Sequence, residues 1–219
     1  MPLVITATGT NVGKTLFSAL VMARYAANLQ LLYLKPVQTG ADSDRETVRA
    51  LTGVDEKYFA ATLYSFPLAA SPHYAAEQDG QTIDLSRMIA RFNEPELKRA
   101  VIELAGGVVV PLTRYYTNLD LMRDAGFPVV LVADTDLGTI NHTVLSHRAL
   151  IQEGIHCAGI FFIGRDNELF SDNAKTILEM TRAKNLGHAF LPKHTLGARE
   201  FHYLLTQFDT QHSLMEYLQ

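Results

Sequence analysis

The sequence predicts a doubly wound α/β fold, in which a mainly parallel sheet carries helices on both of its faces. Short runs of Val, Ile and Leu alternate along the chain with longer segments of helical pattern. The short runs are apolar at nearly every position, which is typical of strands buried on both faces of a parallel sheet. Small or polar residues follow several of these runs, as in sheets that bind ligands beyond the C-terminal ends of their strands.

The predicted strands, in chain order, are residues 3–8, 31–37, 99–104, 127–134 and 157–164. Pro36 lies near the end of the second run, where a missing backbone N–H is tolerated. The predicted helices are residues 13–27, 44–51, 85–92, 142–152 and 172–183. The first helix is rich in Ala and Leu and has no internal Gly or Pro. Residues 58–79 and those after 186 have no clear pattern.

Composition limits the class of protein. A chain of 219 residues with 47% hydrophobic residues can form one domain, residues 1–219, around a sizeable core. A net charge of −4 gives no electrostatic reason to expect nucleic acid or an anionic membrane as partner. The chain has no apolar run long enough to span a bilayer and no secretory signal pattern, so we expect a cytoplasmic protein. With Cys157 as the single cysteine, an intrachain disulfide or thiolate metal site is excluded.

A candidate phosphate-binding loop, "TATGTNVGKT" at residues 6–15, joins the first strand to the first helix. The common P-loop pattern is G-x-x-x-x-G-K-[ST]; this loop keeps Gly13, Lys14 and Thr15 and has Thr8 at the first glycine. Lys14 would reach the β- and γ-phosphates, Thr15 would bind Mg²⁺, and Thr10 would add a hydroxyl donor. The alternative is an ordinary strand-to-helix turn, but the strand–loop–helix context favours a fold of the P-loop NTPase type.

Two carboxylates and a lysine follow other strands of the predicted sheet. Glu103 ends an apolar strand, where an unpaired carboxylate costs free energy, so a partner or a metal is expected there. Asp44 suits a magnesium site, and equally suits the positive end of a helix. Lys35 suits a substrate anion at the crevice, and equally suits a surface lysine with a buried stem.

Four segments, "TGTNVGKT", "KPVQTG", "ELAGGVVVPL" and "LGTINHTVL", occur in the order and spacing of one family. The sequence resembles the dethiobiotin synthetases, ATP-dependent carboxylases that close the ureido ring in biotin synthesis, from about residue 3 to residue 164. The resemblance implies 7,8-diaminononanoate, CO₂ and ATP as substrates and Mg²⁺ as cofactor. It also implies a carbamate, then a carbamic–phosphoric anhydride, then ring closure by the second amine.

The resemblance further implies roles for individual residues of a homodimer whose active site lies at the subunit interface. The nucleotide would contact Thr10, Asn11, Val12, Gly13, Lys14 and Thr15, and the metal would contact Thr15, Asp44 and Glu103. The catalytic residues would be Lys35, Lys14 and Thr10. The substrate would contact Lys35 and Thr39, together with Gly138, Thr139 and Asn141 of the partner subunit, and backbone around residues 108–112.

The sequence departs from the family pattern at four positions. Ala7 and Gly9 replace a Gly and an Asp of the loop, and Leu104 replaces a Gly, which adds bulk beside the metal ligand Glu103. Ile163 falls where the family has its adenine-recognising Asn, so the base specificity stays open. The alternative functions are a switch or partitioning NTPase, which needs no group like Lys35, and a relative that has lost ring closure.

Overall fold

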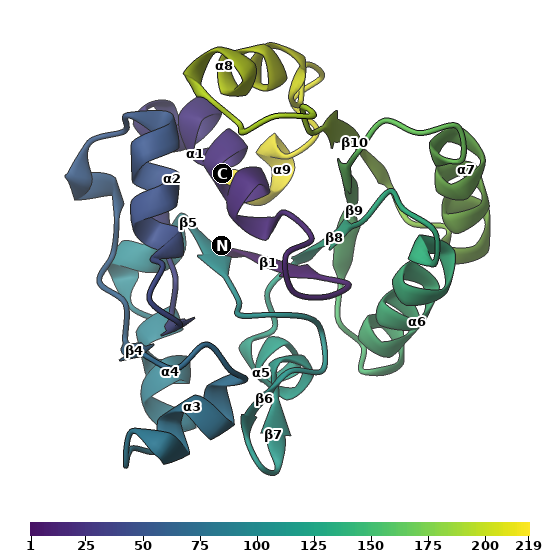
Figure 1. Cartoon of the computed structure of the whole chain (residues 1–219). Coiled ribbons are helices and arrows are strands. Elements are labelled where there is room, and N and C mark those ends of the chain that lie inside the picture. Colours follow the sequence, from purple (N-terminus) through teal and green to yellow (C-terminus); the bar gives the residue numbers. More distant parts are fainter.

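The centre of the molecule is a six-stranded sheet in which every pair of neighbouring strands is parallel (Figure 1). The computed structural model describes all residues, 1–219. The strands of the sheet are β10 (Asn185–Phe190), β9 (Cys157–Gly164), β8 (Val129–Ala133), β1 (Leu3–Ala7), β5 (Ala100–Glu103) and β2 (Leu32–Leu34), in spatial order. The chain runs from β1 to β2, returns to β5 and then crosses to β8. The strand order therefore reverses at β1, and a crevice is expected beyond its C-terminal end.

Helices cover both faces of this sheet, which confirms the predicted doubly wound α/β fold. One face packs against α1 (Lys14–Leu29), α2 (Asp44–Thr52), α8 (Ala198–Gln207) and α9 (Met215–Leu218). The other face packs against α3 (Pro72–Gln78), α4 (Leu85–Phe92), α5 (Asn118–Ala125), α6 (Thr139–Gln152) and α7 (Phe170–Thr181). Alternate residues of β1 point to opposite cores, Leu3 and Ile5 to the first and Val4 to the second. Two 3₁₀ turns, η1 (Glu56–Tyr58) and η2 (Pro95–Lys98), complete the helical elements.

The single strand predicted at residues 31–37 is wrong. It divides at Pro36 into β2 of the main sheet and β3 (Val37–Thr39), which pairs with β4 (Tyr64–Phe66) in a separate parallel ribbon. The carbonyl of Pro36 accepts hydrogen bonds from the backbone N–H groups of Leu63 and Tyr64, so the chain is already paired with the ribbon there. Lys35 therefore lies between the two strands, directly after the C-terminal end of β2.

Other elements were not predicted or begin elsewhere. A second ribbon pairs β6 (Pro111–Thr113) with β7 (Tyr116–Thr117), and α6 begins at Thr139 rather than at residue 142. The strands β4 and β10 and the helices α3, α5, α8 and α9 have no counterpart in the predicted elements. None of the helices in the structure has the length and apolar character needed to cross a bilayer.

The last part of the chain packs behind the first helix. Phe208, which follows α8, lies 5.7 Å from Phe17 of α1 and 5.5 Å from Phe161 of β9, measured between ring centroids. Leu214 and Leu218 belong to the same core and are almost fully buried. Figure 1 shows α8 and α9 beside α1, although they come from the opposite end of the sequence. The C-terminal segment therefore supports the helix that begins at the candidate phosphate loop.

Candidate active site

The candidate phosphate loop leads directly into the N-terminus of α1. Gly13 caps this helix with φ of 102°, and no side chain caps it. A Cβ at Gly13 would lie 2.6 Å from Cγ2 of Ile163, so both the backbone conformation and the close packing require glycine. The first N–H groups of a helix have no partner within the helix and carry partial positive charge. The loop therefore offers an anion site of the kind that holds nucleotide phosphates.

Lys14 is the first residue of α1, and its side chain turns back across the loop. Its Nζ donates a hydrogen bond to the carbonyl of Gly9, at 3.1 Å. The pKa of Lys14 is lowered to about 8, first by burial and then by the positive charge of Lys35, which together outweigh the opposing effect of Glu103 and Asp44. A phosphate chain placed in the loop would supply the negative charge that this lysine lacks.

Three oxygen-bearing side chains meet next to the loop. The Oγ1 atom of Thr15 lies 3.0 Å from Oδ1 of Asp44 and 3.0 Å from Oε1 of Glu103. Thr15 comes from α1, Asp44 from the first turn of α2 and Glu103 from the end of β5. Parallel strands bring their C-terminal ends, and the helices that follow them, to one edge of the sheet, which is why residues so far apart in sequence meet here.

Lys35 joins the two acids. Its Nζ lies 2.6 Å from Oδ2 of Asp44 and 3.1 Å from Oε1 of Glu103. Burial alone would lower the pKa of Lys35, but Glu103 and Asp44 outweigh it and raise that pKa above its ordinary value. Burial would likewise raise the pKa of Asp44, but the charge of Lys35 outweighs it and lowers that pKa. Lys35 is only 2% exposed, so the interpretation of a surface lysine is excluded.

The chemistry of the donor set fits magnesium. Nowhere in the structure are three or more His, Cys, Asp or Glu side chains placed to hold a metal by themselves. Magnesium does not need such a group, since it commonly uses one or two carboxylates together with waters and substrate phosphates. A hydroxyl and two carboxylates, all hard oxygen ligands, meet at the start of the helix that would hold those phosphates.

These groups line one cavity of about 810 Å³. A volume of this order suits a nucleotide's phosphates and a small substrate. The β4–α3 loop and the loop after Glu103 also line it. Of the residues predicted for the site, the lining includes Thr10, Asn11, Gly13, Lys14, Thr15, Lys35, Thr39, Asp44 and Glu103.

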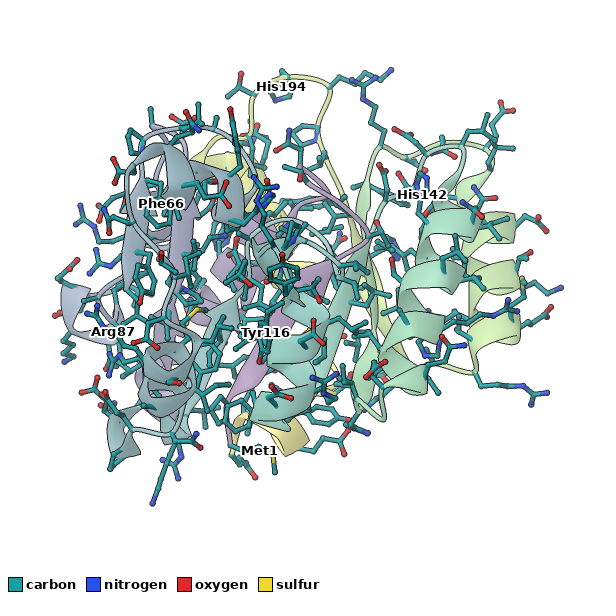
Figure 2. All side chains as sticks on the ribbon, turned by 90° about the horizontal axis from the view of Figure 1, so that it is seen from below. Met1, Phe66, Arg87, Tyr116, His142 and His194 are labelled. Carbon is teal, nitrogen blue, oxygen red and sulfur yellow. The ribbon has the colours of Figure 1, made fainter.

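Some predicted site residues lie elsewhere within the chain. Val12 is packed against the core and does not line the cavity. Gly138 caps α6, the hydroxyl of Thr139 donates to the carbonyl of Asp134 at 2.6 Å, and Asn141 is exposed on α6. In Figure 2, His142, which follows Asn141, lies on the other side of the molecule from Phe66 of β4, the strand that pairs with β3 at the cavity. A single chain therefore does not bring residues 138–141 to its own cavity.

The departures from the family pattern have different structural consequences. Gly9 has free space around it, since the nearest atom to an added Cβ would be Cγ2 of Val12 at 3.7 Å. The bulk that Leu104 adds beside Glu103 lies in the core and not in the cavity, since this side chain is buried and does not line the cavity. Ile163 packs over Gly13 and belongs to the core around α1.

Three further residues hold the site and were not predicted. Ser18 and Tyr33 donate hydrogen bonds to Glu103, and Oε1 of Gln38 accepts a hydrogen bond from the backbone N–H of Asp44. The spacing contained a signal for two of them. Ser18 is three residues after Thr15 and shares its face of the helix, and Tyr33 is two residues before Lys35.

A phosphate loop at the N-terminus of α1, placed where the order of a parallel sheet reverses, defines the class of α/β P-loop NTPases. A family model described as an AAA domain matches residues 2–195. Two solved structures share this fold. One is a ParA family ATPase from Chlorobium tepidum, with a TM-score of 0.55 and 8% identity over 88% of this chain and 84% of that chain. The other is MinD from Aquifex aeolicus, with a TM-score of 0.55 and 13% identity over 99% of this chain and 94% of that chain. At such identities they show the fold alone.

Curated relatives define the family more closely. The chain is 43% identical to the ATP-dependent dethiobiotin synthetase BioD of Leptospira interrogans, over 87% of this chain and 86% of the relative. It is 44% identical to the protein of the same name from Rhodopseudomonas palustris, over 85% and 84% of the two chains. The chain therefore belongs to the ATP-dependent dethiobiotin synthetase family.

Proposed function

We propose that this protein uses ATP to carboxylate 7,8-diaminononanoate and to close the ureido ring of dethiobiotin. Family membership supports the activity, and one observation of the site supports it independently. Lys35 is a buried cation on the wall of the cavity, beside the acids suited to the metal. A switch or partitioning ATPase needs the loop and the metal ligands but no such cation, whereas a carbamate substrate needs one. The synthetase is therefore favoured over that alternative.

The reaction proceeds in three steps. One amine of the substrate attacks CO₂ and loses a proton, which gives a carbamate. A carbamate oxygen attacks the γ-phosphorus of ATP, the bond to the β–γ bridging oxygen breaks, and ADP leaves. The second amine then attacks the carbonyl carbon of the mixed anhydride and loses its proton, phosphate leaves, and the urea ring is closed. Little covalent work falls to the protein, so its contribution is positioning and charge neutralisation.

The residues of the cavity divide this work. The loop N–H groups, Lys14 and the Thr10 hydroxyl would hold the phosphates, and Lys35, with Thr39 beside it, would hold the carbamate. Magnesium, held by Thr15, Asp44 and Glu103, would neutralise phosphate charge when bound. The positions of these oxygen ligands beside the loop support this assignment.

We also propose that the functional unit is a homodimer in which Gly138, Thr139 and Asn141 of one chain complete the partner's cavity. Two observations support it: these residues do not line their own cavity, and Leu137 and Leu145 beside them are 90% and 56% exposed. Mixing two inactive variants, Lys35→Ala and Asn141→Ala, tests the arrangement. A mixed dimer contains one cavity with both natural residues, so activity should return on mixing. No recovery from subunits that demonstrably exchange would exclude a shared site.

The activity itself is tested by phosphate release in the presence of Mg²⁺ and bicarbonate, with and without 7,8-diaminononanoate, using ATP, CTP and GTP in turn. Release that depends on the diamine, with dethiobiotin found by mass spectrometry, is the expected result. Release that is independent of the diamine would instead indicate a switch ATPase. The ranking of the three nucleotides reports how the base is recognised with Ile163 at the end of β9.

A further inference from the structure

Glu103 is fully buried and accepts hydrogen bonds on both of its carboxylate oxygens. Its Oε1 atom faces Thr15 and Lys35, the groups of the cavity wall. Its Oε2 atom accepts from the hydroxyl of Ser18 at 2.6 Å and from the hydroxyl of Tyr33 at 3.0 Å. Neither Ser18 nor Tyr33 lines the cavity, and both are fully buried. The two oxygens therefore have different surroundings, one towards the cavity and one towards the core.

This difference has a consequence for a metal ligand. The terminal torsion of a glutamate is broad, so an unsupported carboxylate rotates between one-oxygen and two-oxygen coordination. Two hydroxyl donors on Oε2 fix the plane of the carboxylate and occupy the lone pairs of that oxygen. A metal ion in the cavity can then reach only Oε1, whose partners Thr15 and Lys35 line the cavity and could give way to it.

Ser18 and Tyr33 also come from the two elements that the site depends on. Ser18 is one turn beyond Thr15 on α1, and Tyr33 is in β2, just before Lys35. Through these two hydrogen bonds the carboxylate of Glu103 is connected both to α1, which begins at the phosphate loop, and to β2, which leads to Lys35. A change in one hydroxyl would alter the position of the ligand oxygen and not only the packing.

We propose that Ser18 and Tyr33 are positioning residues that hold Glu103 so that it presents Oε1 alone to the metal of the bound nucleotide. This inference rests on the proposed magnesium site. Loss of the hydrogen-bonding partners of metal ligands typically weakens metal affinity 10- to 100-fold.

The test is the affinity of Mn²⁺, a spectroscopic substitute for Mg²⁺, for the full-length protein saturated with ADP, measured by electron paramagnetic resonance. We expect Tyr33→Phe and Ser18→Ala each to weaken Mn²⁺ binding about 10-fold or more. The affinity for ADP in the presence of EDTA should stay unchanged, because neither hydroxyl faces the cavity. Tyr25→Phe is the matched control. Tyr25 lies on α1, as Ser18 does, and its hydroxyl donates a hydrogen bond to the buried carboxylate of Asp209, away from the site.

A merely structural role makes a different prediction. Tyr33→Phe and Ser18→Ala would then lower the melting temperature as Tyr25→Phe does and leave Mn²⁺ affinity within twofold of the natural protein, which would overturn the proposal. Glu103→Gln separates this result from failure of the metal assignment. If Glu103→Gln also leaves Mn²⁺ affinity unchanged, Glu103 is no metal ligand and the proposal fails with the assignment, whereas diamine-dependent phosphate release still tests the activity.

Discussion

The side-chain nitrogen of Lys35 lies 2.6 Å from a carboxylate oxygen of Asp44, and the same nitrogen also contacts Glu103. One buried cation thus balances both acids that we assign to the metal. A metal ion that used these oxygens would compete with the ammonium group for them. Lys35 and the metal are therefore coupled, and a change at Lys35 should be measurable as a change in metal affinity.

Lys35→Met should strengthen Mn²⁺ binding and abolish diamine-dependent phosphate release. Without the ammonium group the buried Glu103 has no cation beside it, so the free energy of unfolding in EDTA should fall by about 3 kcal/mol. Added Mn²⁺ should restore part of that loss. Urea unfolding in EDTA and in Mn²⁺ measures the loss of stability and its recovery on metal binding. Lys184→Met, which removes an exposed lysine paired with Glu216, is the control and should change neither. Unchanged Mn²⁺ affinity in Lys35→Met would contradict the shared use of these oxygens.

Nucleotide affinity should fall as the pH rises through about 8. The pKa of Lys14 is lowered to about 8, mainly by burial, so its charged form is complete below that pH and is lost above it. Phosphates favour the charged form, so binding above pH 8 should take up a proton. Calorimetry of ADP binding in two buffers of different ionisation enthalpy measures this uptake. Lys14→Ala should show weak binding and no uptake, and uptake that persists in this variant would assign the proton to another group.

Gly13→Ala should destabilise the protein more than an alanine at another glycine of positive φ that has free space around it. Gly126, at φ of 68°, has no atom within 4 Å of an added Cβ, so Gly126→Ala measures the backbone cost alone, about 1–2 kcal/mol. Gly13→Ala adds the contact with Ile163 and should cost more in urea unfolding. Adding Ile163→Ala to Gly13→Ala should relieve this extra cost. Equal costs for the two glycines would show that Ile163 moves aside freely.

Phe208→Ala should lower the free energy of unfolding by about 3–5 kcal/mol, the usual cost of removing a large buried aromatic side chain. Its ring contacts Phe17 on the helix of the phosphate loop, so ADP affinity should weaken as well. Tyr203→Ala on the exposed face of α8 is the control and should change stability little. A normal stability for Phe208→Ala would mean that the C-terminal segment is not part of the core that supports α1.

The central strands and α1 were predictable because their signals are local. Residues 3–8, 99–104 and 127–134 are mostly apolar runs, and each contains the strand observed, to within two residues at either end. The edge strand β10 was not predictable in this way. Its sequence "NLGHAF" mixes polar residues with Gly187, and its register against β9 is irregular. The short helix α5 has a local signal in the sequence, a capping box between Thr117 and Asp120.

Several residues of the candidate site could be predicted from the sequence, but the contacts between them could not. Spacing and strand ends pointed to Thr15, Asp44 and Glu103, because the chemistry of a phosphate and metal site needs those residue types at strand and helix ends. The contact of Lys35 with both acids was not predictable, since it depends on the division of the second strand at Pro36. Tertiary packing, not local pattern, also decides that Leu104 points into the core.

The aromatic contact between Phe208 and Phe17 also affects when α1 can be packed during translation. The ribosome delivers the loop that would bind nucleotide long before Leu214 and Leu218, which belong to the core behind its helix. Until those residues emerge, one side of α1 is an uncovered apolar surface of the kind that chaperones bind and that aggregates. Nascent chains halted before α8 should therefore have an unprotected α1, and the nucleotide site should mature only after α8 and α9 have been translated.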